Sequence, residues 1–198
     1  VANGQRGGKI KSSKSGAAPV DIGGMDFRFD PVHDRAEAVS GFGQFGLTFD
    51  DGGRRFVCTN RNHVIPLVIP NRYYKRNPFL APPPPVTDNH QAGGSARVYP
   101  LSKNKTLAAT HAGSFTASCG VTVYRGSLLP EAYRGRILTC EPTGNLIHEE
   151  VLTPAGGSFI TYDNPFLAPS VRALMAPGSS FRMVRAVRDW PLNSNEQK

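Results

Sequence analysis

The chain has 198 residues, of which 39% are hydrophobic and 19% charged, with 21 glycines and 17 prolines. This length suits one ordinary domain, and the high Gly and Pro content favours turns and short strands over long helices. The lack of any run of about 18 apolar residues excludes a transmembrane helix, and the composition excludes collagen, a coiled coil and a disulfide-dense mini-protein.

The formal net charge of +8 is concentrated at the two ends of the chain. Residues 1–20 carry four basic and no acidic side chains, residues 171–198 carry five basic and two acidic ones, and the body between them is nearly balanced. Basic tails can bind nucleic-acid phosphates, with a steep dependence on salt. The balanced body and the lack of a known binding motif favour a solvated tail instead, so no nucleic-acid partner is expected.

The N-terminal part of the chain predicts a tail followed by a group of short strands. Residues 1–24 are rich in Gly, Ser and Lys and predict a disordered basic tail. Residues 25–69 predict a first propeller blade, with a hairpin turn at Asp50-Asp51-Gly52-Gly53, because glycine supplies the positive φ that such turns need. The strands expected in this group lie at residues 27–29, 36–39, 44–49, 55–59 and 63–69.

A long connection separates this group from a second one. Residues 70–112 contain four consecutive prolines, Pro82 to Pro85, which predict extended polyproline, and one strand is expected at 97–101. Residues 113–165 predict a second blade, and residues 166–198 form a basic tail of uncertain structure. The elements expected in the second blade are strands at 120–124, 136–140, 144–152 and 158–162 and a helical turn at Glu131-Ala132-Tyr133.

One short string repeats between the two groups. Gly46-Leu47-Thr48-Phe49 is echoed by Gly120-Val121-Thr122-Val123, and each is followed by a turn and then by an Arg-apolar-apolar run. Such a repeat is typical of stacked antiparallel units such as propeller blades, although hairpins of one type can share it by coincidence. A closed propeller needs at least about four blades. The sequence therefore predicts an all-β fold: antiparallel four-stranded blades of an incomplete β-propeller, with long loops.

Several of these strings together resemble the membrane-bound dehydrogenase family of planctomycetes and their relatives. They are Asp26–Pro31, Gly43–Asp51, Arg55–Asn60, Asn71–Tyr74, Arg76–Leu80, Gly120–Gly126, Pro130–Gly135 and Gly144–His148. The resemblance covers roughly residues 20–152. The propeller of that family is similar to soluble pyrroloquinoline-quinone (PQQ) sugar dehydrogenases. The resemblance thus implies an exported, periplasmic oxidoreductase that acts on a sugar or another alcohol.

The chain departs from the family pattern at the positions that carry chemistry. It lacks the haem motif C-x-x-C-H, and the segment 41–43 stands where related dehydrogenases place a catalytic histidine. The pattern also fades after about residue 165, as a truncated or frame-shifted gene would explain. The resemblance therefore implies a fragment of a PQQ-dependent dehydrogenase-like propeller that is inactive alone and needs missing blades or self-association. The alternative is a non-catalytic propeller-type binding or scaffold module.

Five polar residues are the candidate cofactor-binding residues: Gln44, Asn60, Arg61, Asn62 and His63. They offer amides, a guanidinium and a titratable ring, and the resemblance implies that such groups hold the carboxylates and carbonyls of PQQ. Residues 60–63 could instead form an exposed turn in which asparagine caps the backbone. Gln44 could instead form a hydrogen bond to a neighbouring blade. No catalytic residue is assigned.

The histidines and cysteines predict no metal site. No two of the five histidines have the spacing H-x-H or H-x-x-x-H, and His148 is expected on the solvent face of its strand. The three cysteines, Cys58, Cys119 and Cys140, contain no C-x-x-C pair. Their odd number leaves at least one thiol unpaired within the chain, and the disulfide state stays open.

Overall fold

The computed structural model describes most of the body of the chain, and all statements below concern that part. The residues described are 3–4, 7–13, 16–77, 79, 96–98, 113–144, 146–156, 158–162, 171–174 and 182–185. Their regular structure is strands in small antiparallel sheets, with one short helix, α1 (Asn71–Tyr74), and two 3-10 turns. The expected all-β class is confirmed. Among these residues, no helix has the length and apolar character needed to cross a membrane.

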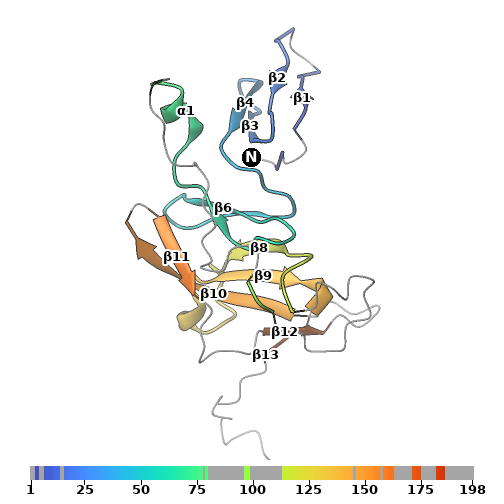
Figure 1. Cartoon of the computed structure of the whole chain (residues 1–198), viewed down its shortest axis with the longest axis vertical. Helices are drawn as coiled ribbons and strands as arrows, with labels where there is room; N and C mark the ends of the chain where they lie inside the picture. The colour runs from blue at the N-terminus through green and yellow to red at the C-terminus, as the bar shows by residue number, and fades with distance from the viewer. Residues whose placement is uncertain are drawn as a thin grey trace, which may run out of the picture.

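The upper part of the molecule holds two short hairpins (Figure 1). Strand β1 (Lys9–Ile10) pairs with β2 (Val20–Asp21), and β3 (Asp26–Asp30) pairs with β4 (Arg35–Val39). The segment expected to be a disordered tail thus contains a two-stranded ladder. Burial of Ile22, which is 5% exposed, supplies the apolar contact that the composition of this segment did not suggest.

The next three strands form a sheet of their own. They are β5 (Leu47–Phe49), β6 (Arg55–Val57) and β7 (Ile65–Pro66), in the order β5-β6-β7. Residues 25–69 therefore do not form one four-stranded blade but two separate sheets. The chain leaves the β3–β4 ladder at Gly41, whose φ of 130° is accessible to glycine and strained for other residues.

The lower part of the molecule is a six-stranded antiparallel sheet with the order β13-β12-β10-β9-β8. The sixth strand, β11, pairs with the C-terminal half of β10. The strands are β8 (Cys119–Val123), β9 (Ile137–Glu141), β10 (Leu146–Ala155), β11 (Ser158–Tyr162), β12 (Val171–Leu174) and β13 (Arg182–Arg185). The last two lie in the segment expected to be a basic tail, whereas the strand expected at 97–101 is described only to residue 98.

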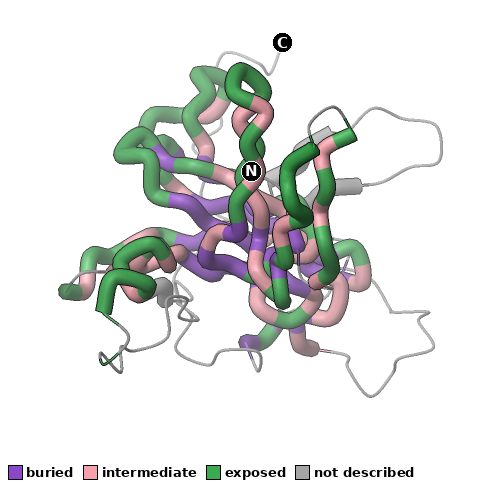
Figure 2. Tube along the Cα trace, turned by 90° about the horizontal axis from the view of Figure 1, so that it is seen from above, coloured by how far each residue is buried: buried purple, intermediate pink, exposed green. Residues whose placement is uncertain are grey.

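The main core lies between these two sheets, where Figure 2 shows the buried residues gathered in the centre of the molecule. Its members come from both sheets: Phe56, Cys58, Val64, Val121, Val123 and Ile137. Glycine lets the sheets approach closely, because a Cβ on Gly46 would lie 2.7 Å from the backbone nitrogen of Val121. The three cysteines are free thiols.

The two copies of the repeated string meet at this contact. The Gly120 amide donates to the Phe45 carbonyl at 2.9 Å, and the Val123 amide donates to Thr48 Oγ1 at 3.2 Å. Strands β5 and β8 therefore lie side by side, each as the first strand of its antiparallel group.

Candidate functional site

The residues predicted to bind a cofactor lie in and around one turn between β6 and β7. The Asn60 amide donates to Gln44 Oε1 at 3.2 Å, so the Gln44 side chain supports the turn. The Asn62 amide donates to Thr59 Oγ1, also at 3.2 Å. Ser118, from the opposite sheet, joins the same turn, since its amide donates to the Asn60 carbonyl at 3.0 Å.

These five residues do not converge on one cavity. Arg61 is exposed and Asn60 and Asn62 are half-buried, whereas His63 is fully buried on the other side of the turn. PQQ is a quinone with three carboxylates, which need several cationic or amide donors around one space. Because Gln44 is engaged with the backbone and only Arg61 presents an accessible cation, the five residues do not fit as a PQQ cradle.

His63 belongs instead to a buried cluster with two residues that the sequence analysis did not select. His63 Nε2 is hydrogen-bonded to Glu150 Oε1, and His148 Nε2 lies 3.2 Å from the same carboxylate oxygen. The side chains of His63 and Glu150 are each 1% exposed and that of His148 is 13% exposed. Two imidazoles and one carboxylate thus meet inside the contact between the two sheets.

Aromatic and backbone contacts hold this cluster in place. The His63 ring stacks on Phe115, with centroids 3.9 Å apart and planes 11° apart. The His148 ring stands edge-on to both rings. Thr139 Oγ1 donates to the His63 carbonyl at 3.2 Å, so β9 fixes the backbone that carries the imidazole.

The charge of Glu150 is stabilised within the cluster. Burial by itself raises the pKa of this carboxyl, but attraction to His63 and hydrogen bonds from both imidazoles outweigh burial and hold the pKa well below its usual range. Glu150 is therefore an anion at neutral pH. Among the described residues, its second oxygen, Oε2, is buried without a hydrogen-bond partner.

The expectation that His148 lies on a solvent face is wrong, because β10 is covered on both faces at this point. Alternation along the strand places Leu146, His148 and Glu150 on the face toward Phe115 and His63, while Ile147 packs with Leu138 on the other. The spacing H-x-E on a strand puts both side chains on one face. That spacing was the available signal, whereas the contribution of His63, 87 positions away from Glu150, had none.

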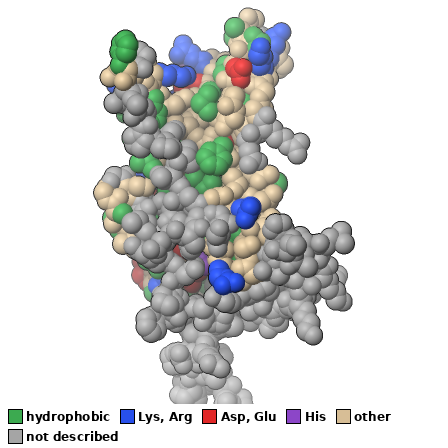
Figure 3. All heavy atoms as spheres, viewed as in Figure 1, with side chains coloured by type: hydrophobic (Ala, Val, Ile, Leu, Met, Phe, Trp, Pro, Cys, Tyr) green, Lys and Arg blue, Asp and Glu red, His purple; other side chains and the backbone are tan. Residues whose placement is uncertain are grey.

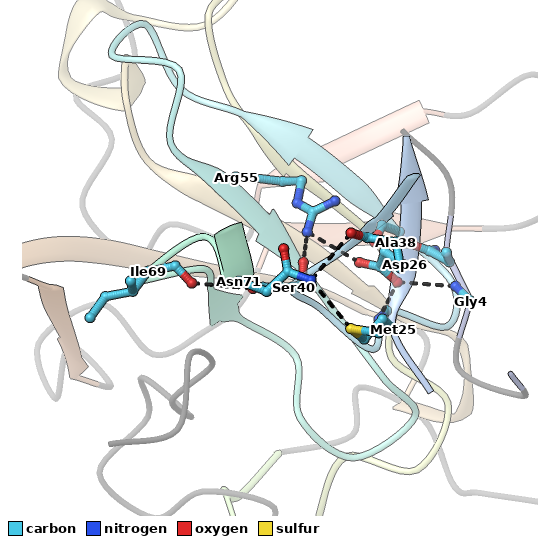
Figure 4. Close-up of polar contacts among 11 residues, drawn as sticks. Gly4, Met25, Asp26, Ala38, Ser40, Arg55, Ile69 and Asn71 are labelled. Atoms are coloured by element: carbon cyan, nitrogen blue, oxygen red, sulfur yellow. Dashed lines mark hydrogen bonds and ion pairs between the residues drawn. The ribbon is translucent and has the colours of Figure 1, made fainter. Parts of the chain in front are cut away.

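A second buried polar group joins the β3–β4 hairpin to the sheet β5–β7 (Figure 4). Asp26, at the start of β3, and Arg55, at the start of β6, form an ion pair with 3.6 Å between Oδ2 and Nη2. The amides of Gly4 and Gly43 donate to Asp26 Oδ1 at 3.0 and 3.1 Å. Arg55 also donates to the Ser40 carbonyl.

Burial disfavours the charged form of both Asp26 and Arg55. It raises the pKa of Asp26, against the opposing hydrogen bonds from the backbone and the attraction of Arg55. It lowers the pKa of Arg55, against the attraction of Asp26. The pair fills the contact between the N-terminal segment, β3 and β6 and leaves no accessible face for a ligand, so we interpret it as structural.

Several basic side chains lie around a groove in the upper part of the molecule. Figure 3 shows Lys and Arg side chains at the upper end of the molecule, over the hairpins β1–β4 and α1. An open groove between the hairpins is lined by Lys11, Arg28 and Arg35, but also by acidic residues including Asp34 and Glu37. This mixture of charges does not form the uniform basic surface that phosphate binding requires.

The comparisons with known proteins give one family. The profile of the family described as "Domain of unknown function (DUF7133)" matches residues 1–169. This match covers most of the chain, which therefore belongs to that family. No curated protein matches the chain, and no solved structure matches it either.

Proposed function

We propose that this member of the family forms two adjacent blades of a β-propeller related to the quinoprotein dehydrogenases. The observation that carries the proposal is the contact between β5 and β8, because the two copies of the repeated string lie side by side as first strands of their groups. In a propeller the first strands of successive blades are neighbours around the central channel. The antiparallel orders β5-β6-β7 and β8-β9-β10-β12 agree with this arrangement.

The role proposed for the chain itself is to build and close the ring rather than to hold the cofactor. The polar residues of the turn after β6 serve the backbone and the opposite sheet, as the contacts of Gln44 and Ser118 show. In this proposal the catalytic residues, the quinone site and the sugar or alcohol site of an exported dehydrogenase-like protein lie in further blades.

Exposed aromatic residues support the need for further blades. Phe42, Phe45 and Phe49 are 39%, 51% and 37% exposed along the segment that leads into and through β5. Several exposed aromatic side chains on one short segment mark an interaction surface. A preceding blade of the same ring would cover it.

A titration with PQQ tests the division of roles. The purified chain is titrated with PQQ in the presence of Ca²⁺ and followed by fluorescence, together with Arg61→Ala and the control Arg134→Ala, another exposed arginine of a turn. We expect no saturable binding by any of the three. Saturable binding by the native chain that Arg61→Ala abolishes and Arg134→Ala retains would contradict the structural role and restore Arg61 as a cofactor ligand.

An experimental structure of the chain with its natural neighbouring segments tests the propeller itself. We expect β5 and β8 to line one channel together with the first strands of further four-stranded units. Two sheets that close face to face as a sandwich, with no shared channel, would contradict the proposal and favour an independent binding or scaffold module.

A further inference from the structure

We propose that His63, His148 and Glu150 form a three-ligand binding site for a divalent transition-metal ion, with Zn²⁺ as the preferred ion. Their nearest ligand atoms all lie within 4.8 Å of one another. This inference does not rest on the proposed function, because it concerns only the contact between the sheet β5–β7 and the strands β9 and β10.

The donor set matches zinc chemistry. Two neutral imidazole nitrogens and one carboxylate are ordinary zinc ligands, with bonds of about 2.0–2.2 Å, which place neighbouring ligand atoms about 3.3 Å apart in a tetrahedral site. The separation of 3.2 Å between His148 Nε2 and Glu150 Oε1 already has this size. The His63 nitrogen lies closer to the carboxylate and would have to move away from it to bind the ion.

The buried carboxylate gives a second and independent indication of a ligand. Both Nε2 atoms are directed at Oε1, whereas Oε2 is buried with no hydrogen-bond partner among the described residues. An ionised carboxylate inside a protein normally fills all of its acceptor positions, because an unsatisfied one costs free energy. A cation bound by both carboxylate oxygens would offset this cost, and Oε2 would then complete four coordination together with Oε1 and the two imidazoles.

The surroundings favour a structural ion over a catalytic one. His63 and Glu150 are inaccessible to solvent, and Phe115 covers the His63 ring, so a substrate has no route to the centre. His63 follows β6, whereas His148 and Glu150 belong to β10. The ion would therefore connect the two halves of the core across 87 positions of sequence, as structural zinc ions do in small domains.

The three proposed ligands are two imidazoles and a carboxylate, with no thiolate among them. This ligand set determines which ions the site prefers. Imidazole and carboxylate together suit zinc, iron, nickel and copper, whereas magnesium and calcium prefer sites made only of oxygen. A closed site with no substrate access calls for no redox change, which favours zinc.

Metal content and cobalt substitution test the site. The protein is dialysed against a chelator, then titrated with ZnCl₂ while its Tm is recorded, and separately with CoCl₂ while its visible absorption is recorded. In the zinc titration, we expect the protein to retain one equivalent of zinc by elemental analysis and its Tm to rise by several degrees in excess zinc. In the cobalt titration, we expect the intense visible bands of four-coordinate Co²⁺. His148→Ala and Glu150→Gln are expected to lose the cobalt bands and the zinc-induced shift.

His33→Ala is the matched control, because His33 also pairs with a carboxylate, Asp30, but at the surface of the β3–β4 turn. It is expected to behave like the native protein. If a variant of the cluster fails to fold, the cobalt spectrum of the native protein still decides. A folded native protein that binds neither ion and shows no shift in Tm would overturn the proposal and leave a metal-free ion pair.

Discussion

Burial of a single thiol makes stability depend on pH in the alkaline range. Cys58 is fully buried in the main core, and burial raises the pKa of its thiol to about 11 from the ordinary value of 9.0. The unfolded chain therefore releases this proton at lower pH than the folded chain does. The stabilising contribution of the neutral thiol is complete below pH 9 and is lost as pH rises toward 11.

We expect the free energy of unfolding to fall between pH 9 and 11, and Cys58→Ala to reduce this slope. Urea denaturation at several pH values measures the effect. In the same range, a thiol reagent should modify Cys119 and Cys140, which are only partly buried, before Cys58. Rapid modification of Cys58 in the folded protein would show that the thiol is accessible and that the argument fails.

The ion pair between Asp26 and Arg55 predicts strong coupling between two substitutions. Asp26→Asn or Arg55→Met alone leaves a buried charge without its partner, and such changes cost about 3–5 kcal/mol. The double variant removes both charges, so its loss should be clearly smaller than the sum of the two single losses. Denaturant unfolding of the four proteins measures the coupling.

The pair Arg28–Glu37 is the control for this cycle. It joins β3 and β4 with side chains that are 53% and 49% exposed. Solvent screens such pairs, so the equivalent cycle should give a coupling below about 1 kcal/mol. Equal coupling for the two pairs would mean that burial of Asp26 and Arg55 has no energetic effect.

At the scale of the elements, the contact between β5 and β8 depends on the absence of a side chain at Gly46. A methyl group there would meet the Val121 backbone nitrogen at 2.7 Å and Cys58 Sγ at 3.0 Å, and the backbone atom cannot rotate away. Gly46→Ala should therefore force the two sheets apart and cost about 1–3 kcal/mol, the usual cost of overpacking a core.

Gly16→Ala is the matched control, because a Cβ at Gly16 meets no atom within 4 Å. Thermal unfolding of both variants checks the prediction, and the control is expected to match the native Tm. Unchanged stability of Gly46→Ala would show that the sheets are not held in contact at this point.

The elements whose patterns are local could be predicted from sequence. The turn at residues 50–53 forms as expected, since the Arg54 amide donates to Asp50 Oδ1 at 2.8 Å. The strand at Ser158–Tyr162 and the helical turn at Glu131–Tyr133 have the expected bounds. The β1–β2 ladder was missed although it is local, because the Gly- and Ser-rich composition of residues 1–24 gives no sign of the apolar contact that the buried Ile22 supplies.

The candidate site, too, could be predicted from sequence only in part. His63 was selected for its chemistry, but its partners lie on a strand far along the chain, and a tertiary contact of this kind leaves no spacing that a single sequence can show. The alternative of a turn at residues 60–63 was right about the turn but not about the capping groups, because the amides of Asn60 and Asn62 donate to the side chains of Gln44 and Thr59. The turn was thus predictable, and its hydrogen-bond partners were not.

At the scale of the whole molecule, the exposed strip Phe42, Phe45 and Phe49 determines how the isolated chain behaves. Phe42 and Phe45 precede β5, and Phe49 is its last residue. Exposed apolar side chains of this kind mark contacts between chains. If further blades normally cover this strip, copies of the isolated chain should cover it for one another.

We expect the isolated chain to self-associate as its concentration rises, and the double variant Phe45→Ser/Phe49→Ser to shift it toward the monomer. Light scattering after size exclusion, over a tenfold range of concentration, measures the change in mass. Val32→Ser is the control, because Val32 is 83% exposed but lies in the β3–β4 turn away from this strip. A native chain that stays monomeric throughout would show that this strip needs no covering, which would remove one support of the propeller proposal. Equal effects of the control and the double variant would point to general surface hydrophobicity instead, because only a specific contact through the strip makes the position of the serines matter.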